Sequence, residues 1–157
     1  MIVRHDMIAV YVVRPDETGD SHEFLQLRRR DTDFMGRTWQ TISGTSDAGE
    51  TAAAAALREL REETGLHPRE FYRLGSCETF YIPHSGREVI WLCPAFCAIV
   101  DRADEVVLND EHDAHRWIPR RDATRAFMWA TQWPVIAEIE RVILDGDIAR
   151  EHLRMPL

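Results

Sequence analysis

The sequence predicts an α/β fold in which helices flank a mixed β-sheet. Strand-like runs and helical patterns follow one another in the order strands, helix, strands and helices, which is typical of a sheet covered by helices. The chain has 157 residues, 45% of them hydrophobic and 29% charged, so it can bury a substantial core. The sequence contains no repeat, low-complexity tract or linker. We therefore expect residues 1–157 to form one domain.

Three strands and a helix are expected in the first part of the chain. The β-branched run at 7–13 is typical of a central strand, and residues 22–28 alternate as a second strand does. The Pro, Asp, Gly and Ser residues at 15–21 predict a turn or loop between them. A third strand at 37–43 leads into a helix expected from 49 to 64. The alternating N-terminus, with an aspartate inside it, indicates a strand rather than a signal peptide.

A hairpin and two helices are expected in the rest of the chain. Residues 71–82 and 89–100 are long strand-like runs joined by a Pro-His-Ser-Gly turn, a combination typical of a β-hairpin. A short strand is expected at 115–118, followed by helices at 121–128 and 133–144. The C-terminal tail carries no clear signal.

One of these helices carries three carboxylates on a single face. Glu59, Glu62 and Glu63 have the i, i+3, i+4 spacing that places side chains next to one another on a helix. Three like charges repel one another there, and a divalent cation with a preference for oxygen ligands would neutralise them. Gly65 follows the last turn, where a left-handed cap is common. This face therefore predicts a metal site.

The segment around this helix has a fixed spacing of charged and glycine residues. From Gly44 to Leu66 it reads GTSDAGETAAAAALRELREETGL, which fits G-x5-E-x7-R-E-U-x-E-E-x-G-U, where U is aliphatic. This segment, called the box below, resembles the box of the Nudix hydrolases at every fixed position. The resemblance implies a Nudix-type α/β/α sandwich over most of the chain and a single Nudix hydrolase domain. It also implies hydrolysis of phosphoanhydride bonds.

The resemblance further implies which residues do chemistry and which hold the box in shape. Arg58 would fix the preceding loop on the helix through Glu50, and Gly65 would end the helix. Mg²⁺, or else Mn²⁺, would activate water and bridge phosphate oxygens. The implied metal ligands are the Gly44 carbonyl, Glu59, Glu62, Glu63 and Glu111. The candidates for the catalytic base are Glu62, Glu63 and Glu111. Glu111 lies outside the box, and the alternative for it is a surface glutamate in an acidic loop.

Features outside the box resemble one group within the family, the bacterial dihydroneopterin triphosphate diphosphatases. These features are the run LRRRDTDF, the approach WQTISG and the EH…W segment that begins at Glu111. The resemblance implies removal of pyrophosphate from a pterin triphosphate. The chain departs from this group in a longer loop between Phe34 and Trp39 and in a shorter hairpin turn at 83–87. Both departures fall where a ring would be recognised.

Two other functions stay open. The approach to the box also resembles diadenosine polyphosphate hydrolases, so a general nucleoside triphosphate or diadenosine polyphosphate hydrolase is an alternative. A non-catalytic module that only binds a nucleotide is a further alternative. Such modules usually lose carboxylates of the box, and here every one is present.

Substrate contacts are expected from one tryptophan and three arginines. Trp39 lies on the strand that enters the box, and a flat pterin or purine ring stacks well on an indole. Core packing is the alternative for Trp39. Arg28, Arg29 and Arg37 fit phosphate contacts and equally fit a solvated strand end.

Composition narrows the range of partners. A formal net charge of −8 disfavours nucleic acid polymers and anionic membranes, which need basic patches, so a small-molecule polyphosphate is the expected partner. The longest apolar runs are too short for a membrane span. Cys77, Cys93 and Cys97 lack a CxxC pair and are expected to be small core residues in a reducing cytosol. The oligomeric state stays open.

Overall fold

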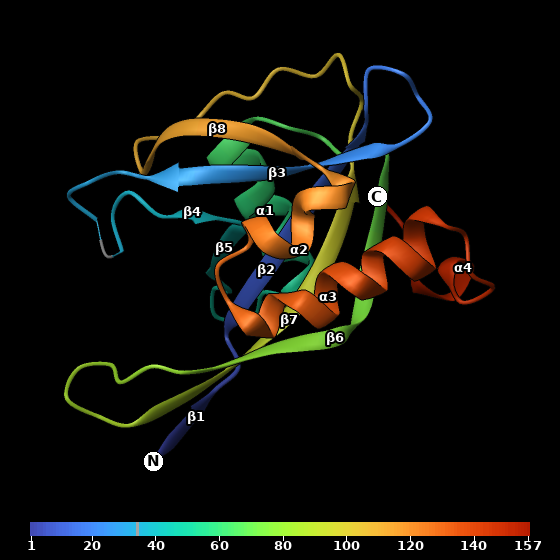
Figure 1. Cartoon of the computed structure of the whole chain (residues 1–157). Helices are drawn as coiled ribbons and strands as arrows, with labels where there is room; N and C mark the ends of the chain where they lie inside the picture. The colour runs from blue at the N-terminus through green and yellow to red at the C-terminus, as the bar shows by residue number, and fades with distance from the viewer. Residues whose placement is uncertain (34) are drawn as a thin grey trace.

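The computed structural model describes residues 1–33 and 35–157, and Phe34, part of the LRRRDTDF run, lies outside them. Within these residues, nine strands form one sheet with helices on both faces (Figure 1). The strands are β1 (Ile2–Arg4), β2 (Met7–Pro15), β3 (His22–Arg29), β4 (Trp39–Gln40), β5 (Ile42–Thr45), β6 (Glu70–Tyr81), β7 (Val89–Ile99), β8 (His112–Pro119) and β9 (Arg154–Met155). Their order is β4-β3-β2-β7-β6-β9, with β1 beside β7, β5 beside β2 and β8 beside β3.

The centre of the sheet is β2, and its apolar sequence explains this position. It pairs in parallel with β7 and antiparallel with β3 and β5, so the predicted mixed sheet is confirmed. Every residue from Ile8 to Val13 is at most 2% exposed, as expected of a strand covered on both faces. Successive side chains point to opposite faces. One core contains Ile8, Val10 and Val12, and the other contains Ala9, Tyr11 and Val13.

Helix α1 (Ala52–Thr64) covers the first of these faces. It begins after Thr51, whose side chain accepts a hydrogen bond from the Ala54 N–H, and it ends at Gly65, whose φ of 69° is the expected left-handed cap. The helix starts later than the predicted residue 49, because Gly49 has a φ of 82° that a helix does not use. Its buried side chains Ala55, Ala56 and Leu60 pack into the core of this face.

The second face is covered by the C-terminal helices. These are η1 (Arg120–Asp122), α2 (Ala123–Ala126), η2 (Ala130–Gln132), α3 (Trp133–Glu138) and η3 (Ile139–Leu144), a π-helical continuation of α3. Val135, Ile136, Ile139 and Ile143 are buried in the core with Tyr11. The layers confirm the predicted α/β/α sandwich. Across residues 1–33 and 35–157, none of the helices has the length and apolar character needed to cross a bilayer.

The strand expected from 37 to 43 is two short strands instead. Strand β4 pairs with β3, whereas β5 pairs with β2, so the chain changes partner at Thr41. The Thr41 hydroxyl donates a hydrogen bond to the Val10 carbonyl at 2.5 Å, which holds the crossing in place. Arg37 precedes β4 with a φ of 65°, outside the extended range of a strand.

The N-terminus forms strands as expected, and the tail, for which no structure was predicted, adds a helix and a strand. The tail forms α4 (Arg150–Leu153) and β9, which pairs with Phe71 and Tyr72 at the start of β6. The N-terminal β1 pairs in parallel with β7 and is separated from β2. The predicted hairpin is confirmed, since β6 and β7 are antiparallel neighbours.

The cysteines only partly match the expectation. Cys93 and Cys97 are buried in the core under α3, as predicted, and all three thiols are free. The prediction for Cys77 is wrong, because its side chain is exposed. Cys77 follows a register irregularity in β6 that begins at Arg73, so simple alternation does not place its side chain.

Candidate active site

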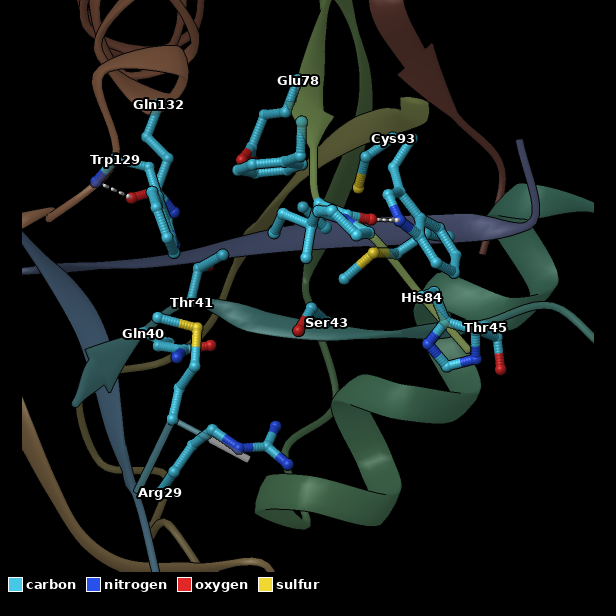
Figure 2. Close-up of a pocket in the computed structure, with 17 residues that line it drawn as sticks. Arg29, Gln40, Thr41, Ser43, Thr45, Glu78, His84, Cys93, Trp129 and Gln132 are labelled. Carbon is cyan, nitrogen blue, oxygen red and sulfur yellow. Dashed lines mark hydrogen bonds between the residues drawn. The ribbon is translucent and has the colours of Figure 1, made fainter. Parts of the chain in front are cut away.

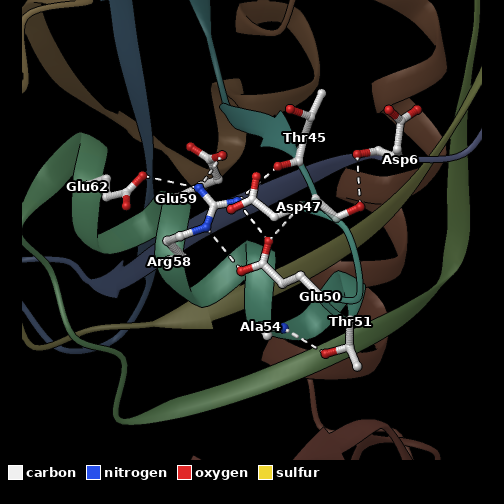
Figure 3. Close-up of polar contacts among 10 residues, drawn as sticks. Asp6, Thr45, Asp47, Glu50, Thr51, Ala54, Arg58, Glu59 and Glu62 are labelled. Carbon is white, nitrogen blue, oxygen red and sulfur yellow. Dashed lines mark hydrogen bonds and ion pairs between the residues drawn. The ribbon is translucent and has the colours of Figure 1, made fainter.

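Arg58 of α1 ties the box loop to the helix. Its Nε and Nη2 donate to the two Glu50 carboxylate oxygens, each at 3.0 Å, and Nη2 also donates to the Thr45 carbonyl at 2.9 Å. Glu50 also accepts a hydrogen bond from the Asp47 N–H at 2.9 Å. These bonds lower the pKa of Glu50, the Arg58 bond most of all. Figure 3 shows the guanidinium between Glu50 and the carboxylate face of the helix.

The same guanidinium contacts the predicted metal face. Arg58 Nη1 donates to Glu59 at 2.8 Å and to Glu62 at 3.2 Å (Figure 3). Glu59 is partly buried and lies directly against the backbone of β5. A Cβ on Gly44 would overlap the carboxyl carbon of Glu59, so only glycine leaves room for this carboxylate. The glycine of the box thus serves close approach, and it also brings the Gly44 backbone beside a candidate ligand.

Glu63 is a buried carboxylate without a matching charge. The residue is 4% exposed, and its Oε2 has no hydrogen-bond partner among the described residues. The nearest cationic candidate is His112 Nε2 at 3.8 Å, but burial and Arg29 lower the pKa of His112 to about 4, so the ring is neutral at pH 7. Burial first, and then the charges of Glu59 and Glu111, raise the pKa of Glu63 well above its usual range.

Glu111 approaches the helix from the loop before β8. Its charge raises the pKa of both Glu59 and Glu63, although burial is the larger cause for each. Its Oε2 lies 3.6 Å from Arg29 Nη2, and the side chain is 57% exposed. Glu59, Glu62, Glu63 and Glu111 are called the carboxylate cluster below.

The carboxylate cluster fits a hard divalent cation in its chemistry. Carboxylate oxygens are the ligands that Mg²⁺ and Mn²⁺ prefer, and the orphaned Glu63 oxygen lacks only a positive partner. Over residues 1–33 and 35–157, however, no three acidic, His or Cys side chains stand close enough together to hold an ion. Arg58 Nη1 bonds the carboxylates of both Glu59 and Glu62, so a positive charge already accompanies these two groups.

A cavity of about 490 Å³ lies on the other face of the sheet (Figure 2). Strands β2, β5, β6 and β7 contribute to it, and the segment around η2 closes it. Its polar groups are few and its walls mostly apolar, which is typical of a small-molecule site. The lining includes Arg29, Ser43, Glu78, Phe80, Trp129 and Gln132.

Two residues connect this cavity to the carboxylate cluster. Ser43 lines the cavity, and its backbone acts to lower the pKa of Glu63, against the larger effect of burial. Arg29 also lines the cavity and pairs with Glu111. Arg29 Nε is buried without a partner among the described residues, so it can still donate to an anion. Among the described residues, the four carboxylates of the cluster lie outside the cavity lining, and Arg29 is the side chain that links the cavity to the cluster through Glu111.

The other expected substrate residues lie elsewhere. Trp39 does not line the cavity, and the Arg116 guanidinium covers its ring at 4.2 Å from the centroid. Arg28 pairs with Asp113 at 2.7 Å, and the exposed Arg37 pairs with Asp31 at 2.7 Å. The tryptophans of the cavity are Trp91 and Trp129.

Sequence reasoning missed Glu78 and Gln132, which line the cavity although both are buried. Neither belongs to a spaced pattern, and Glu78 meets its partner Tyr11 across 67 positions. Glu78 is one of two charged residues, with Arg73, in the strand-like run at 71–82, and this was the available signal for it.

Comparisons with known proteins agree with this geometry. Dihydroneopterin triphosphate diphosphatase of Escherichia coli strain K12 is 28% identical over 142 residues, covering 81% of this chain and 87% of the relative. The structure of the E. coli dihydroneopterin triphosphate pyrophosphohydrolase has a TM-score of 0.68 at 22% identity, covering 93% of this chain and 100% of that chain. The C. elegans Ap4A hydrolase in a binary complex has a TM-score of 0.68 at 20% identity, covering 92% and 99%. At these identities the structural likeness shows the fold alone.

The family assignment rests on sequence over most of the chain. The sequence model of the NUDIX domain matches residues 4–139, from β1 to the start of η3. The match contains the box with each of its charged residues. The chain therefore belongs to the NUDIX domain family.

Proposed function

We propose that this Nudix pyrophosphohydrolase removes pyrophosphate from dihydroneopterin triphosphate in the presence of Mg²⁺. The observation that carries the proposal is the junction at Ser43 and Arg29, which both line the apolar cavity and also act on the carboxylate cluster, Ser43 on Glu63 and Arg29 on Glu111. The flat pterin ring of this substrate would occupy the apolar cavity, and its triphosphate would interact with Arg29 and the metal ions held by the carboxylate cluster. The E. coli relative, which is named for this substrate and covers 81% of the chain, supports the choice.

The residues of the junction would position the triphosphate of the substrate. Arg29, with a buried and unpaired Nε, would donate to a phosphate oxygen. The ligands proposed for Mg²⁺ are the Gly44 carbonyl, Glu59, Glu62, Glu63 and Glu111. When bound there, Mg²⁺ would neutralise phosphate charge and acidify water.

Proton transfer is assigned to the carboxylate cluster. A buried carboxylate with a raised pKa, as Glu63 has, holds a proton more firmly than an exposed one. The side chains of Glu62 and Glu111 are each 57% exposed, so both are candidate bases that can be reached from solvent. Arg58 would orient Glu59 and Glu62 rather than touch the substrate, because its guanidinium is engaged by the box.

The cavity would hold the ring. Trp129 has its indole near Phe80, with ring centroids 5.8 Å apart, so together they offer an apolar wall. We assign stacking to Trp129 instead of Trp39, whose ring face is covered by Arg116. The three free thiols are consistent with a reducing cytosol as the proposed compartment.

The same apolar wall would stack a purine as readily as a pterin, which keeps a general nucleoside triphosphate or diadenosine polyphosphate hydrolase as the second candidate. A substrate panel distinguishes them. Dihydroneopterin triphosphate, GTP, dATP and diadenosine tetraphosphate are each incubated with Mg²⁺, and phosphate and pyrophosphate are measured separately. We expect the pterin triphosphate to have the highest kcat/KM, with pyrophosphate as product.

A purine triphosphate or dinucleoside polyphosphate that is better by about tenfold would replace the pterin proposal with the general one. Absence of hydrolysis for every compound, in protein shown to be folded, would contradict the proposed substrate class as a whole. A Glu63→Gln variant in the same panel controls for contaminating phosphatases.

A further inference from the structure

Glu78 is a buried carboxyl group in the wall of the cavity. It comes from β6, is 1% exposed and lines the cavity beside Cys93, its partner on β7 (Figure 2). Its Oε1 accepts a hydrogen bond from the Tyr11 hydroxyl at 2.6 Å. Nothing in the box chemistry described above uses this group.

The hydrogen bonds of Glu78 leave half of the carboxyl group available. Tyr11 has one hydroxyl proton, and it is donated to Oε1. Among the described residues, Tyr11 is the hydrogen-bond partner of the carboxyl group, and no charged group acts on it. Because Glu78 lines the cavity, its second oxygen is the acceptor that it offers to a ligand there.

Within residues 1–33 and 35–157, no charged group balances Glu78. The titratable groups that face it are Tyr11 of β2, Cys93 of β7 and Cys77 of its own strand, and the pKa of each is raised. All three are neutral at pH 7. Burial raises the pKa of Glu78 itself to about 7, against the opposing effect of the Tyr11 bond. A buried carboxyl without a cation is costly, whereas glutamine would satisfy Tyr11 equally well.

A second polar group lies beside this carboxyl. Gln132 also lines the cavity, and its Oε1 accepts the Trp129 backbone N–H at 3.1 Å. This bond fixes the amide next to the indole wall (Figure 2). A flat ring against Trp129 would thus have its edge near hydrogen-bonding groups of Glu78 and Gln132.

We propose that Glu78 is the specificity-determining residue of the cavity and that its Oε2, through its two lone pairs, accepts hydrogen bonds from two adjacent N–H donors on a ring edge. A ring N–H beside an exocyclic amino group, as in guanine and the pterins, has this pattern. Adenine presents a ring acceptor next to its amino group and would leave the carboxylate facing a lone pair. The inference rests on the proposed function for the place of the ring, and it names the edge that is recognised.

Ring binding tests this inference apart from hydrolysis. Guanosine, inosine, adenosine and neopterin are titrated into the metal-free protein by calorimetry. We expect guanosine to bind at least about tenfold more tightly than inosine. Inosine lacks the exocyclic amino group, so it would leave the buried Glu78 acceptor without a partner. In Glu78→Gln the ratio of guanosine affinity to inosine affinity should fall to about threefold or less.

Two variants sharpen the result. Glu88→Gln is the matched control, because Glu88 also accepts a hydrogen bond from a tyrosine hydroxyl, that of Tyr81, but is exposed and outside the cavity. The Glu88→Gln variant should keep the wild-type ratio of guanosine affinity to inosine affinity. Glu78→Asp keeps the carboxylate but moves it away from the ring because the side chain is shorter, so its affinity ratio should lie between those of the wild type and Glu78→Gln. Near-ultraviolet circular dichroism verifies that each variant is folded.

The outcomes separate the two proposals. Equal affinity of the wild type for guanosine and inosine overturns the role of Glu78, even if triphosphates are hydrolysed. A ratio in Glu78→Gln equal to that of the wild type overturns this role as well. Loss of the ratio in Glu78→Gln, in a protein that hydrolyses no triphosphate of the panel, supports the ring site while the proposed function fails.

Discussion

Arg58 binds both carboxylate oxygens of Glu50 across the eight positions that separate the two residues. The pair closes the loop of residues 45–50 onto α1. Because the same guanidinium reaches Glu59 and Glu62, one side chain couples the shape of the loop to the position of the carboxylates.

Replacing Arg58 with alanine should lower both stability and activity. Its loss leaves Glu50 without its main partner and removes two charge-assisted hydrogen bonds that hold the loop. Urea unfolding measures the first effect, and kcat with Mg²⁺ measures the second. Arg61→Ala, on the exposed side of the same helix, is the control. A purely catalytic defect with unchanged unfolding would contradict the role in holding the loop.

Replacing Glu62 or Glu63 with glutamine should leave the fold intact and slow turnover by about 10²-fold or more, the scale of losing a proton acceptor or metal ligand. Steady-state kinetics at saturating Mg²⁺ provide the measurement. Glu151→Gln, which changes an exposed glutamate of α4, should behave as wild type. If both cluster variants stay within a few-fold of wild type, the assignment of the metal site is wrong.

Mg²⁺ should raise the melting temperature of the wild type. An ion that binds only the folded state stabilises it by mass action, by about 2.7 kcal/mol at a hundred times its Kd. Glu63→Gln should show a smaller rise, because the orphaned oxygen is gone. Thermal unfolding with MgCl2, and again after addition of EDTA, provides the comparison. Identical shifts in the two proteins would argue against Glu63 as a ligand.

Stability should depend on pH through Glu78. Its pKa rises from an ordinary 4.5 to about 7 on folding, so the folded chain keeps the proton that the unfolded chain releases. The stabilising contribution is fully present below about pH 4.5 and is lost as pH rises through about 7.

The Glu78→Gln variant has no titrating carboxyl group at this position, so this pH-dependent change in stability is absent from it. The free energy of unfolding of the variant, minus that of the wild type, should therefore increase by about 2–3 kcal/mol between about pH 5 and about pH 8. Urea titrations at the two pH values give this difference, and other titrating groups cancel in it. A constant difference would show that the buried carboxyl does not change its protonation in that range.

Local patterns allowed much of the fold to be predicted. Strand β2 was found because an apolar β-branched run needs cover on both faces, and α1 because Gly65 and the spacing of Glu59, Glu62 and Glu63 are encoded within a few turns. Three members of the carboxylate cluster followed from the same spacing, whereas Glu111 was named from the family resemblance.

Contacts between distant segments were not predictable in this way. Arg116 covers Trp39 only because β8 and β4 both pair with β3. Glu78 meets Tyr11 only because β7 brings β6 next to the centre of the sheet. The pairing of β9 with Tyr72 is likewise a property of the folded edge rather than of the tail sequence.

Strand β5 presents alternate residues to the two faces of the sheet. Ser43 and Thr45 line the cavity, while Gly44 lies against Glu59 of α1. Ring preference and bond cleavage can therefore diverge independently in evolution. Substitutions on the cavity side can retarget the protein to another ring while the face that handles phosphate keeps its ancestral chemistry.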